Sequence, residues 1–173
     1  MIFCLNQFKK YLPILAVLLV NFAIAQDAKR FERELLKIDV KTAHGKDVNM
    51  SKVEAPIIVL NFWASWCRPC VAEFKSLNKF IEHIGDKKIF VLGINNDEEK
   101  ALKALDKFER NYKLKFNSVL DDQVAFTDKF MVSKIPTSII FVNKKFYKFV
   151  PERFDFMDED FLKKIKAKAN IVD

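Results

Sequence analysis

The sequence predicts one α/β domain, in which helices flank a central mixed sheet, a β-hairpin comes first and one extra helix is inserted. Three observations favour this class. The chain has 173 residues, half of them apolar, which suits a single hydrophobic core. Short apolar runs typical of strands alternate with segments of helical periodicity. The last two β-rich segments follow one another directly, as in an antiparallel hairpin.

Residues 1–25 have the pattern of an export signal. Two lysines precede an uncharged apolar stretch, which ends in small residues. We expect cleavage after Ala25. The stretch is shorter than the roughly 20 residues that span a bilayer, although an uncleaved segment could remain as an anchor. Residues 26–35 are charged and are expected to form an arm or a short helix, and residues 36–173 the domain.

The first elements of the domain follow from their patterns. Alternating apolar residues at 36–40 and 48–50, on either side of a glycine-containing turn, predict a β-hairpin. The continuous apolar run at 57–62 predicts a central strand that is buried on both faces. Apolar residues then recur at helical spacing over 71–84, and Gly85 follows as a C-cap, which predicts a helix.

The rest of the chain continues the alternation of strands and helices. A buried strand, a helix with an acidic start, a short strand, a short helix, an antiparallel hairpin and a last helix are expected at residues 88–94, 95–112, 118–120, 124–130, 138–150 and 157–169. This order predicts a largely parallel sheet that is extended by antiparallel edge strands.

The formal net charge is +7, but the basic residues are not concentrated on one face. Lysine and arginine are interspersed with aspartate and glutamate through most of the chain, whereas nucleic-acid binding needs a face that follows phosphates. We therefore expect no nucleic-acid partner.

Cys67 and Cys70 carry the predicted chemistry. Cys4 lies in the segment expected to be removed, so two cysteines remain, three residues apart at a helix start. A structural disulfide across so short a loop would constrain the unfolded chain very little, which favours a redox use. Zinc needs about four ligands, and His44 and His83 stand at no metal-binding spacing. We expect neither a metal nor another cofactor.

The position of Cys67 favours its thiolate. Free backbone N–H groups and the positive end of the helix dipole lower the pKa of a thiol at a helix N-terminus, and Arg68 adds a cation. Pro69 fixes the backbone between the two cysteines. Trp66 can shield the sulfurs and offer an apolar platform to a substrate. We predict Cys67 as the nucleophile and Cys70 as the resolving thiol.

The segment at 61–70, Asn-Phe-Trp-Ala-Ser-Trp-Cys-Arg-Pro-Cys, resembles the active site of the thioredoxin superfamily, and Ile135-Pro136-Thr137 resembles the cis-proline loop of that superfamily. The resemblance covers about residues 36–169. It implies a thioredoxin-like fold in which Pro136 is cis and faces the cysteines, while Ile135 presents its backbone to a substrate strand.

The leading hairpin and the inserted helix resemble the exported TlpA/ResA-like branch of thiol–disulfide oxidoreductases. This resemblance implies a periplasmic or otherwise exported reductase of protein disulfides, re-reduced by a membrane electron donor. Cytochrome c maturation and general redox homeostasis are the roles it implies. A disulfide oxidant or isomerase, and a thioredoxin-fold binding module without turnover, are the alternatives.

Two positions depart from the pattern. Asn61 stands where ordinary thioredoxins carry a buried aspartate that assists proton transfer from the second cysteine, so a relay must use water or another acid, or the exchange is slower and more specialised. Arg68 stands where some reductases of the branch have glutamate. Asp97, Glu98 and Glu99 are the acids nearest to the end of a central strand, and their expected role is to begin a helix.

Overall fold

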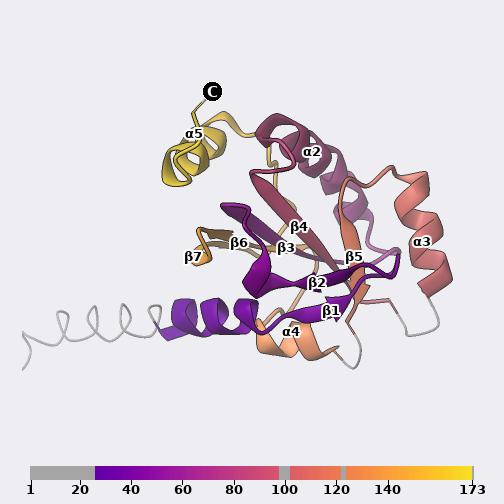
Figure 1. The fold of residues 1–173 in the computed structure, drawn as a ribbon. Coiled ribbons are helices and arrows are strands. Elements are labelled where there is room, and N and C mark those ends of the chain that lie inside the picture. Colours follow the sequence, from indigo (N-terminus) through magenta and orange to yellow (C-terminus); the bar gives the residue numbers. More distant parts are fainter. Residues whose placement is uncertain (1–25, 98–101, 122–123, 173) are drawn as a thin grey trace, which may run out of the picture.

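The computed structural model describes residues 26–97, 102–121 and 124–172, which form a five-stranded sheet with helices on both faces (Figure 1). Three parallel strands lie next to two antiparallel ones in the order β5-β4-β3-β6-β7. The strands are β3 (Ile57–Trp63), β4 (Ile89–Asn95), β5 (Asn117–Leu120), β6 (Thr137–Val142) and β7 (Lys145–Val150). The predicted mixed sheet is confirmed.

The central strand β3 is buried along its whole length because side chains from both faces pack into cores. Ile57, Val59 and Trp63 belong to one core. Ile58 and Phe62 belong to the core on the opposite face. The apolar run in the sequence therefore reports a strand that is covered on both sides.

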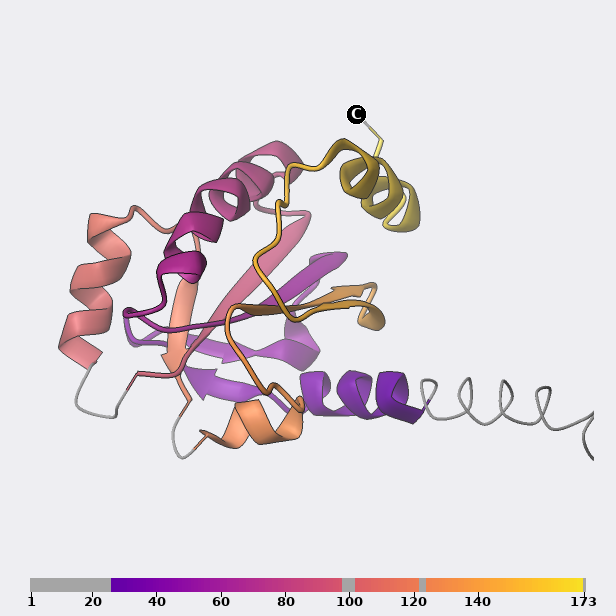
Figure 2. The ribbon, with the colours of Figure 1, turned by 180° about the vertical axis from the view of Figure 1, so that it is seen from behind.

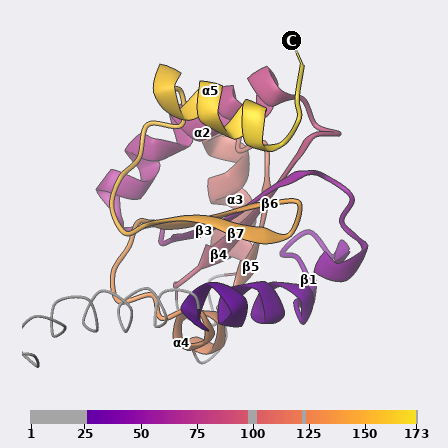
Figure 3. The same ribbon diagram turned by 90° about the vertical axis from the view of Figure 1, so that its left-hand side faces the viewer.

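Helices from different parts of the chain cover the two faces of the sheet. Figure 3 shows the sheet between α2 and α5 on one side and the N-terminal helix and α4 on the other, and Figure 2 shows α3 beside α2. The helices are residues 26–36, α2 (Arg68–Ile84), α3 (Leu102–Asn111), α4 (Ala125–Lys129) and α5 (Glu159–Lys168). The predicted order of elements is confirmed from the hairpin to the last helix.

The segment expected to be an arm or a short helix is a helix that packs on the sheet. Phe31 and Leu35 are buried in the core on this face of the sheet. Ile38, two residues after the end of the helix, belongs to the same core. Leu36, which the alternating pattern assigned to the first strand, is the last helical residue and is 44% exposed. The strand prediction was wrong there because Phe31 and Leu35, on one face of the helix, pack in the core and the helix runs on through Leu36.

Parts of the predictions lie outside the described residues. The export segment at 1–25 and the acids Glu98 and Glu99 are among them. Within the described part of the chain, no helix has both the length and the apolar character needed to cross a membrane.

The predicted hairpin consists of β1 (Asp39–Lys41) and β2 (Asp47–Asn49), which pair antiparallel. Gly45 adopts a positive φ of 77° in the turn, a conformation that glycine tolerates. A 3₁₀ turn, η1 (Met50–Lys52), follows. Its N-cap is Asn49, whose side chain accepts a hydrogen bond from the Ser51 N–H.

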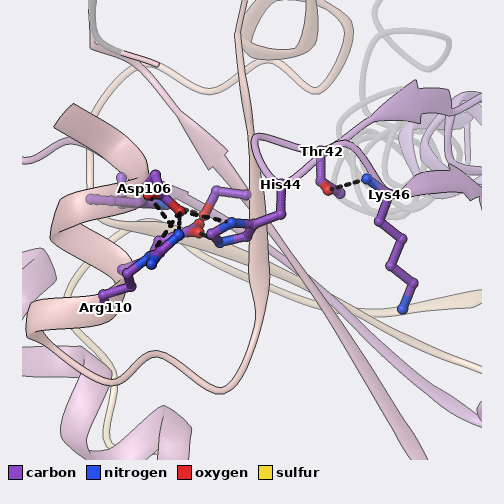
Figure 4. A network of polar contacts seen from close by, with 8 residues as sticks. Thr42, His44, Lys46, Asp106 and Arg110 are labelled. Atoms are coloured by element: carbon purple, nitrogen blue, oxygen red, sulfur yellow. Dashed lines mark hydrogen bonds and ion pairs between the residues drawn. The ribbon is translucent and has the colours of Figure 1, made fainter. Parts of the chain in front are cut away.

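His44 attaches the hairpin to α3 (Figure 4). Its Nδ1 lies 2.9 Å from Asp106 Oδ1, and its Nε2 lies 2.6 Å from Glu109 Oε2. Glu109 is buried, and burial raises the pKa of its carboxyl, while hydrogen bonding to Ser118 and the charge of His44 act in the opposite direction. His44 therefore places an imidazole nitrogen against a buried carboxyl group.

Replacing His44 with glutamine is expected to lower the free energy of unfolding by about 1–3 kcal/mol, because the buried Glu109 carboxyl loses its contact with the imidazole Nε2. Urea unfolding at pH 6 measures the loss. His83→Gln is the matched control, since the second histidine of the chain is exposed on α2. Equal losses in the two variants would contradict a special role of the His44 contacts.

Candidate functional site

The fold delivers the cysteine pair to the carboxyl edge of the central strand. β3 ends at Trp63, a turn follows, and Cys67 is the N-cap of α2. Cys67 and Cys70 form a disulfide, with their Cα atoms 5.3 Å apart. The Cys70 N–H donates to Cys67 Sγ at 3.3 Å, so the first sulfur receives a hydrogen bond at the helix N-terminus. Pro69 occupies the first helical turn, where its missing N–H is not needed.

The surroundings of the pair differ between its two ends. Both cysteines are buried, Cys67 at 5% exposure and Cys70 at 1%. Trp66 is 70% exposed directly before Cys67, and Arg68 is exposed directly after it. An apolar ring and a cation thus flank the first cysteine on the surface. This arrangement suits a partner that approaches Cys67.

The second predicted motif reaches the same edge of the sheet. The Ile135–Pro136 peptide bond is cis, as the resemblance implied. Thr137, the next residue, begins β6 and pairs in register with Phe62 near the end of β3. Ile135 and Pro136 therefore lie at the end of the sheet where the Trp66–Cys67 turn leaves it, although they are far from it in the sequence.

Glu73 is a buried acid at the site that the sequence analysis missed. It lies three residues after Cys70 on α2 and is only 1% exposed. Asn61 Nδ2 donates to Glu73 Oε1 at 2.8 Å and to Ser138 Oγ at 2.9 Å. The Phe154 N–H donates to Glu73 Oε2 at 2.7 Å. Asn61 is thus the partner of a buried carboxyl from the neighbouring helix.

Burial raises the pKa of Glu73 to about 7, against the opposing effects of the Phe154 N–H, Asn61, Ser138 and Arg153. A carboxyl with this pKa can both take up and release a proton near neutral pH. A cavity of about 460 Å³ lies beside Glu73, between α2 and the segment 153–157. Arg153 and Phe154 line the same cavity.

A signal for Glu73 is present in the sequence. Glu73 is spaced by four, seven and eleven residues from Leu77, Phe80 and Ile84, all of which are buried. It therefore stands on the apolar stripe of the helix, where a charged residue is costly unless it is paired or protonated. An acid on this stripe, one turn after a cysteine, is the pattern to look for.

Asn61 also has an atom without a partner. Its Oδ1 is buried and meets no hydrogen-bond donor among the residues described. An amide presents an acceptor and a donor, so rotation of the Asn61 side chain by half a turn would present Oδ1 to a protonated Glu73. Asparagine at this position can thus serve both protonation states of the neighbouring acid while it stays neutral itself.

Of the three acids after β4, the structure describes Asp97. Its Oδ1 and Oδ2 accept from the Ser65 N–H at 3.0 and 3.3 Å. The residue therefore contacts the turn that carries the cysteines. Asn95, which the sequence assigned to the start of a helix, is the last residue of β4.

Comparison with known proteins agrees with this geometry. The family model described as AhpC/TSA matches residues 24–150. The chain is 29% identical over 101 residues to the thiol-disulfide oxidoreductase ResA of Bacillus subtilis, a match that covers 58% of this chain and 55% of ResA. It is 30% identical over 106 residues to the thioredoxin-like protein YneN of the same organism, covering 61% of each. The chain thus spans about half the length of ResA.

Solved structures establish the fold. StoA from Bacillus subtilis has a TM-score of 0.61 at 22% identity, covering 75% of this chain and 95% of StoA. A secreted disulfide oxidoreductase of Mycobacterium tuberculosis, homologous to DsbE of Escherichia coli, has a TM-score of 0.63 at 21% identity, covering 80% and 98%. The thioredoxin-like fold predicted from the two motifs is confirmed.

Proposed function

This chain belongs to the AhpC/TSA family of thioredoxin-like proteins, and we propose that it is an exported thiol–disulfide oxidoreductase that reduces protein disulfides through Cys67 and Cys70. The observation that carries the proposal is a disulfide at the N-terminus of α2, one helical turn before a buried acid with a pKa of about 7. Relatives named thiol-disulfide oxidoreductases support the reaction class.

The first step is attack by the Cys67 thiolate on a sulfur of the substrate disulfide. The Cys67–substrate bond forms as the substrate S–S bond breaks, and the departing substrate sulfur leaves as a thiolate that takes a proton. Backbone N–H groups at the start of α2 stabilise the attacking thiolate. Trp66 and the Ile135–Pro136 segment hold the substrate chain beside it.

The second step releases the product. Cys70 gives its proton to the Glu73 carboxylate and attacks Cys67 Sγ, so the Cys67–Cys70 bond forms and the second substrate thiolate leaves. Glu73 is one helical turn from Cys70, a spacing at which Cβ atoms lie about 5–6 Å apart. Two electrons pass from the protein to the substrate, so an external dithiol must reduce the pair again. We assign that task to a membrane electron donor.

The reducing direction and the biological role are parts of the same proposal. Reductases are needed in exported compartments because disulfides accumulate there, and a segment with an export pattern precedes the domain. The TlpA/ResA-like resemblance favours cytochrome c maturation or redox homeostasis. A reduction potential near about −270 mV would support a reductase, whereas one near about −120 mV would instead indicate an oxidant.

Replacing Cys70 with serine tests the reaction. The variant is expected to accumulate mixed disulfides through Cys67, because the resolving thiol is missing, and to lose insulin-disulfide reduction. Non-reducing gels and mass spectrometry detect the trapped species. Cys67→Ser is the matched control and should trap none. If neither variant traps a partner and the unmodified chain leaves insulin intact, the chain is a binding module without turnover.

A further inference from the structure

The turn between β3 and α2 is held by a side chain from the segment that follows β4. Within the turn, the Cys67 N–H donates to the Ala64 carbonyl at 3.1 Å. The Ser65 N–H donates out of the turn, to both carboxylate oxygens of Asp97. A carboxylate is a stronger acceptor than a neutral carbonyl, and here it meets the Ser65 N–H at 3.0 Å on the exposed side of the turn. Asp97 therefore fixes the backbone two residues before the first cysteine.

Asp97 is itself held in place. Asn95 Nδ2 donates to Asp97 Oδ2 at 3.2 Å, and the Asp97 N–H donates back to Asn95 Oδ1 at 3.1 Å. Asn95 is fully buried as the last residue of β4, in register with Trp63. The Asn96 N–H also donates to the Trp63 carbonyl at 2.8 Å. The Asp97 carboxylate is thus held next to the paired ends of β3 and β4.

The contact matters most after the disulfide opens. In the disulfide form the covalent ring between Cys67 and Cys70 holds Cys67 at the helix N-terminus. In the dithiol form this ring is absent, and hydrogen bonds within and around the turn must keep the sulfur in front of the free N–H groups. Asp97 acts on the same turn from outside it, so its contact does not depend on the redox state of the pair.

We propose that Asp97 is a positioning residue, which acts through Ser65 to hold the reduced Cys67 thiolate at the N-terminus of α2. Asp97 touches neither the sulfurs nor the substrate in this role. The proposal deepens the proposed function, on which it rests, because it concerns the nucleophile of the same site. It gives the acid nearest to the end of β4 a task other than beginning a helix.

Two substitutions separate orientation from charge. Asp97→Ala removes both acceptor oxygens, whereas Asp97→Asn removes the charge and keeps one acceptor for the Ser65 N–H. Asp39→Ala is the control, because Asp39 accepts a side-chain hydrogen bond from Asn49 on the exposed hairpin, away from the cysteines. Circular dichroism and thermal unfolding establish that each variant is folded.

The readout is the rate at which iodoacetamide alkylates Cys67 in the reduced protein, measured from pH 4 to pH 9. We expect Asp97→Ala to shift the inflection to higher pH and to slow alkylation about tenfold at pH 6, because a misplaced sulfur loses the helix N-terminus. Asp97→Asn is expected to remain within about threefold of the unmodified chain. A loss of global stability alone would not move this inflection.

An unchanged profile in Asp97→Ala would overturn the proposal. Equal shifts in Asp97→Ala and Asp97→Asn would also overturn it, since the acceptor that Asp97→Asn keeps for the Ser65 N–H would then make no difference. Alkylation needs no disulfide substrate and no turnover. A chain that failed to reduce insulin would therefore refute the proposed function without deciding the role of Asp97.

Discussion

Replacing Glu73 with glutamine is expected to slow closure of the Cys67–Cys70 disulfide about 100-fold, because Cys70 loses its proton acceptor. Attack by Cys67 should be nearly unchanged, so mixed disulfides accumulate in this variant as they do in Cys70→Ser. Stopped-flow mixing of the reduced protein with a peptide disulfide resolves the two steps. In the unmodified chain, the rate of the second step should rise with pH through about 7, the pKa of Glu73.

The same substitution should alter how stability depends on pH. The pKa of Glu73 is raised from the ordinary value of 4.5 to about 7 in the folded protein, so between these values the folded chain binds more protons than the unfolded chain. The free energy of unfolding therefore falls as the pH rises from 4.5 to 7, by about 3 kcal/mol. Below pH 4.5 the neutral acid carries no such penalty.

Urea unfolding of the oxidised protein between pH 4 and pH 8 measures this slope. Glu73→Gln should flatten it, because the amide stays neutral throughout. Glu82→Gln is the matched control on the same helix, since Glu82 is exposed and pairs with Lys115. Equal slopes in the unmodified chain and in Glu73→Gln would show that Glu73 does not titrate in this range.

The fold could be predicted from the sequence because the apolar residues of its main elements follow a clear strand or helix pattern. The run at 57–62 is too continuous for a half-exposed strand, and the spacing over 71–84 matches a helix. The segment around Leu36 shows where pattern alone fails, since three alternating residues also fit the end of a helix. The packing of Phe31 and Leu35 against the sheet decides between the two.

The candidate site was predictable only where its chemistry is local. The spacing of Cys67 and Cys70 predicts a redox pair, and the resemblance to the thioredoxin superfamily predicts the cis Pro136. Glu73 acquires its raised pKa from burial, against the hydrogen bonds of Phe154, Asn61 and Ser138, which come from three other parts of the chain. Asp97 reaches Ser65 across two strand ends. Neither contact is visible before the strands are placed in register.

The two tryptophans show how strongly the position of a residue in the fold decides whether its side chain is buried. Trp63 is fully buried, its ring lies 5.1 Å from those of Phe74 and Phe108, and its Nε1 donates to Ser118 Oγ at 3.3 Å. Trp66, three residues later, is 70% exposed. Both stand within the same motif in the sequence, yet only the first belongs to the core.

We expect Trp63→Ala to lower the free energy of unfolding by about 3–5 kcal/mol, because it leaves a cavity behind the cysteine turn. Trp63→Phe should cost about 1–3 kcal/mol, since it keeps an aromatic ring and leaves Ser118 without its donor. Trp66→Ala should change stability by less than about 0.5 kcal/mol, while it raises the KM for a peptide disulfide. Urea unfolding followed by circular dichroism compares the three variants.

These variants also separate stability from substrate binding. If Trp66→Ala destabilised the chain as much as Trp63→Ala, its ring would have to be packed in the core and could not serve as a platform for substrate. If Trp66→Ala instead left both stability and KM unchanged, substrate would have to approach Cys67 from the side of Ile135 and Pro136 alone. A stable Trp66→Ala variant with a raised KM places the substrate against the exposed ring beside the nucleophile.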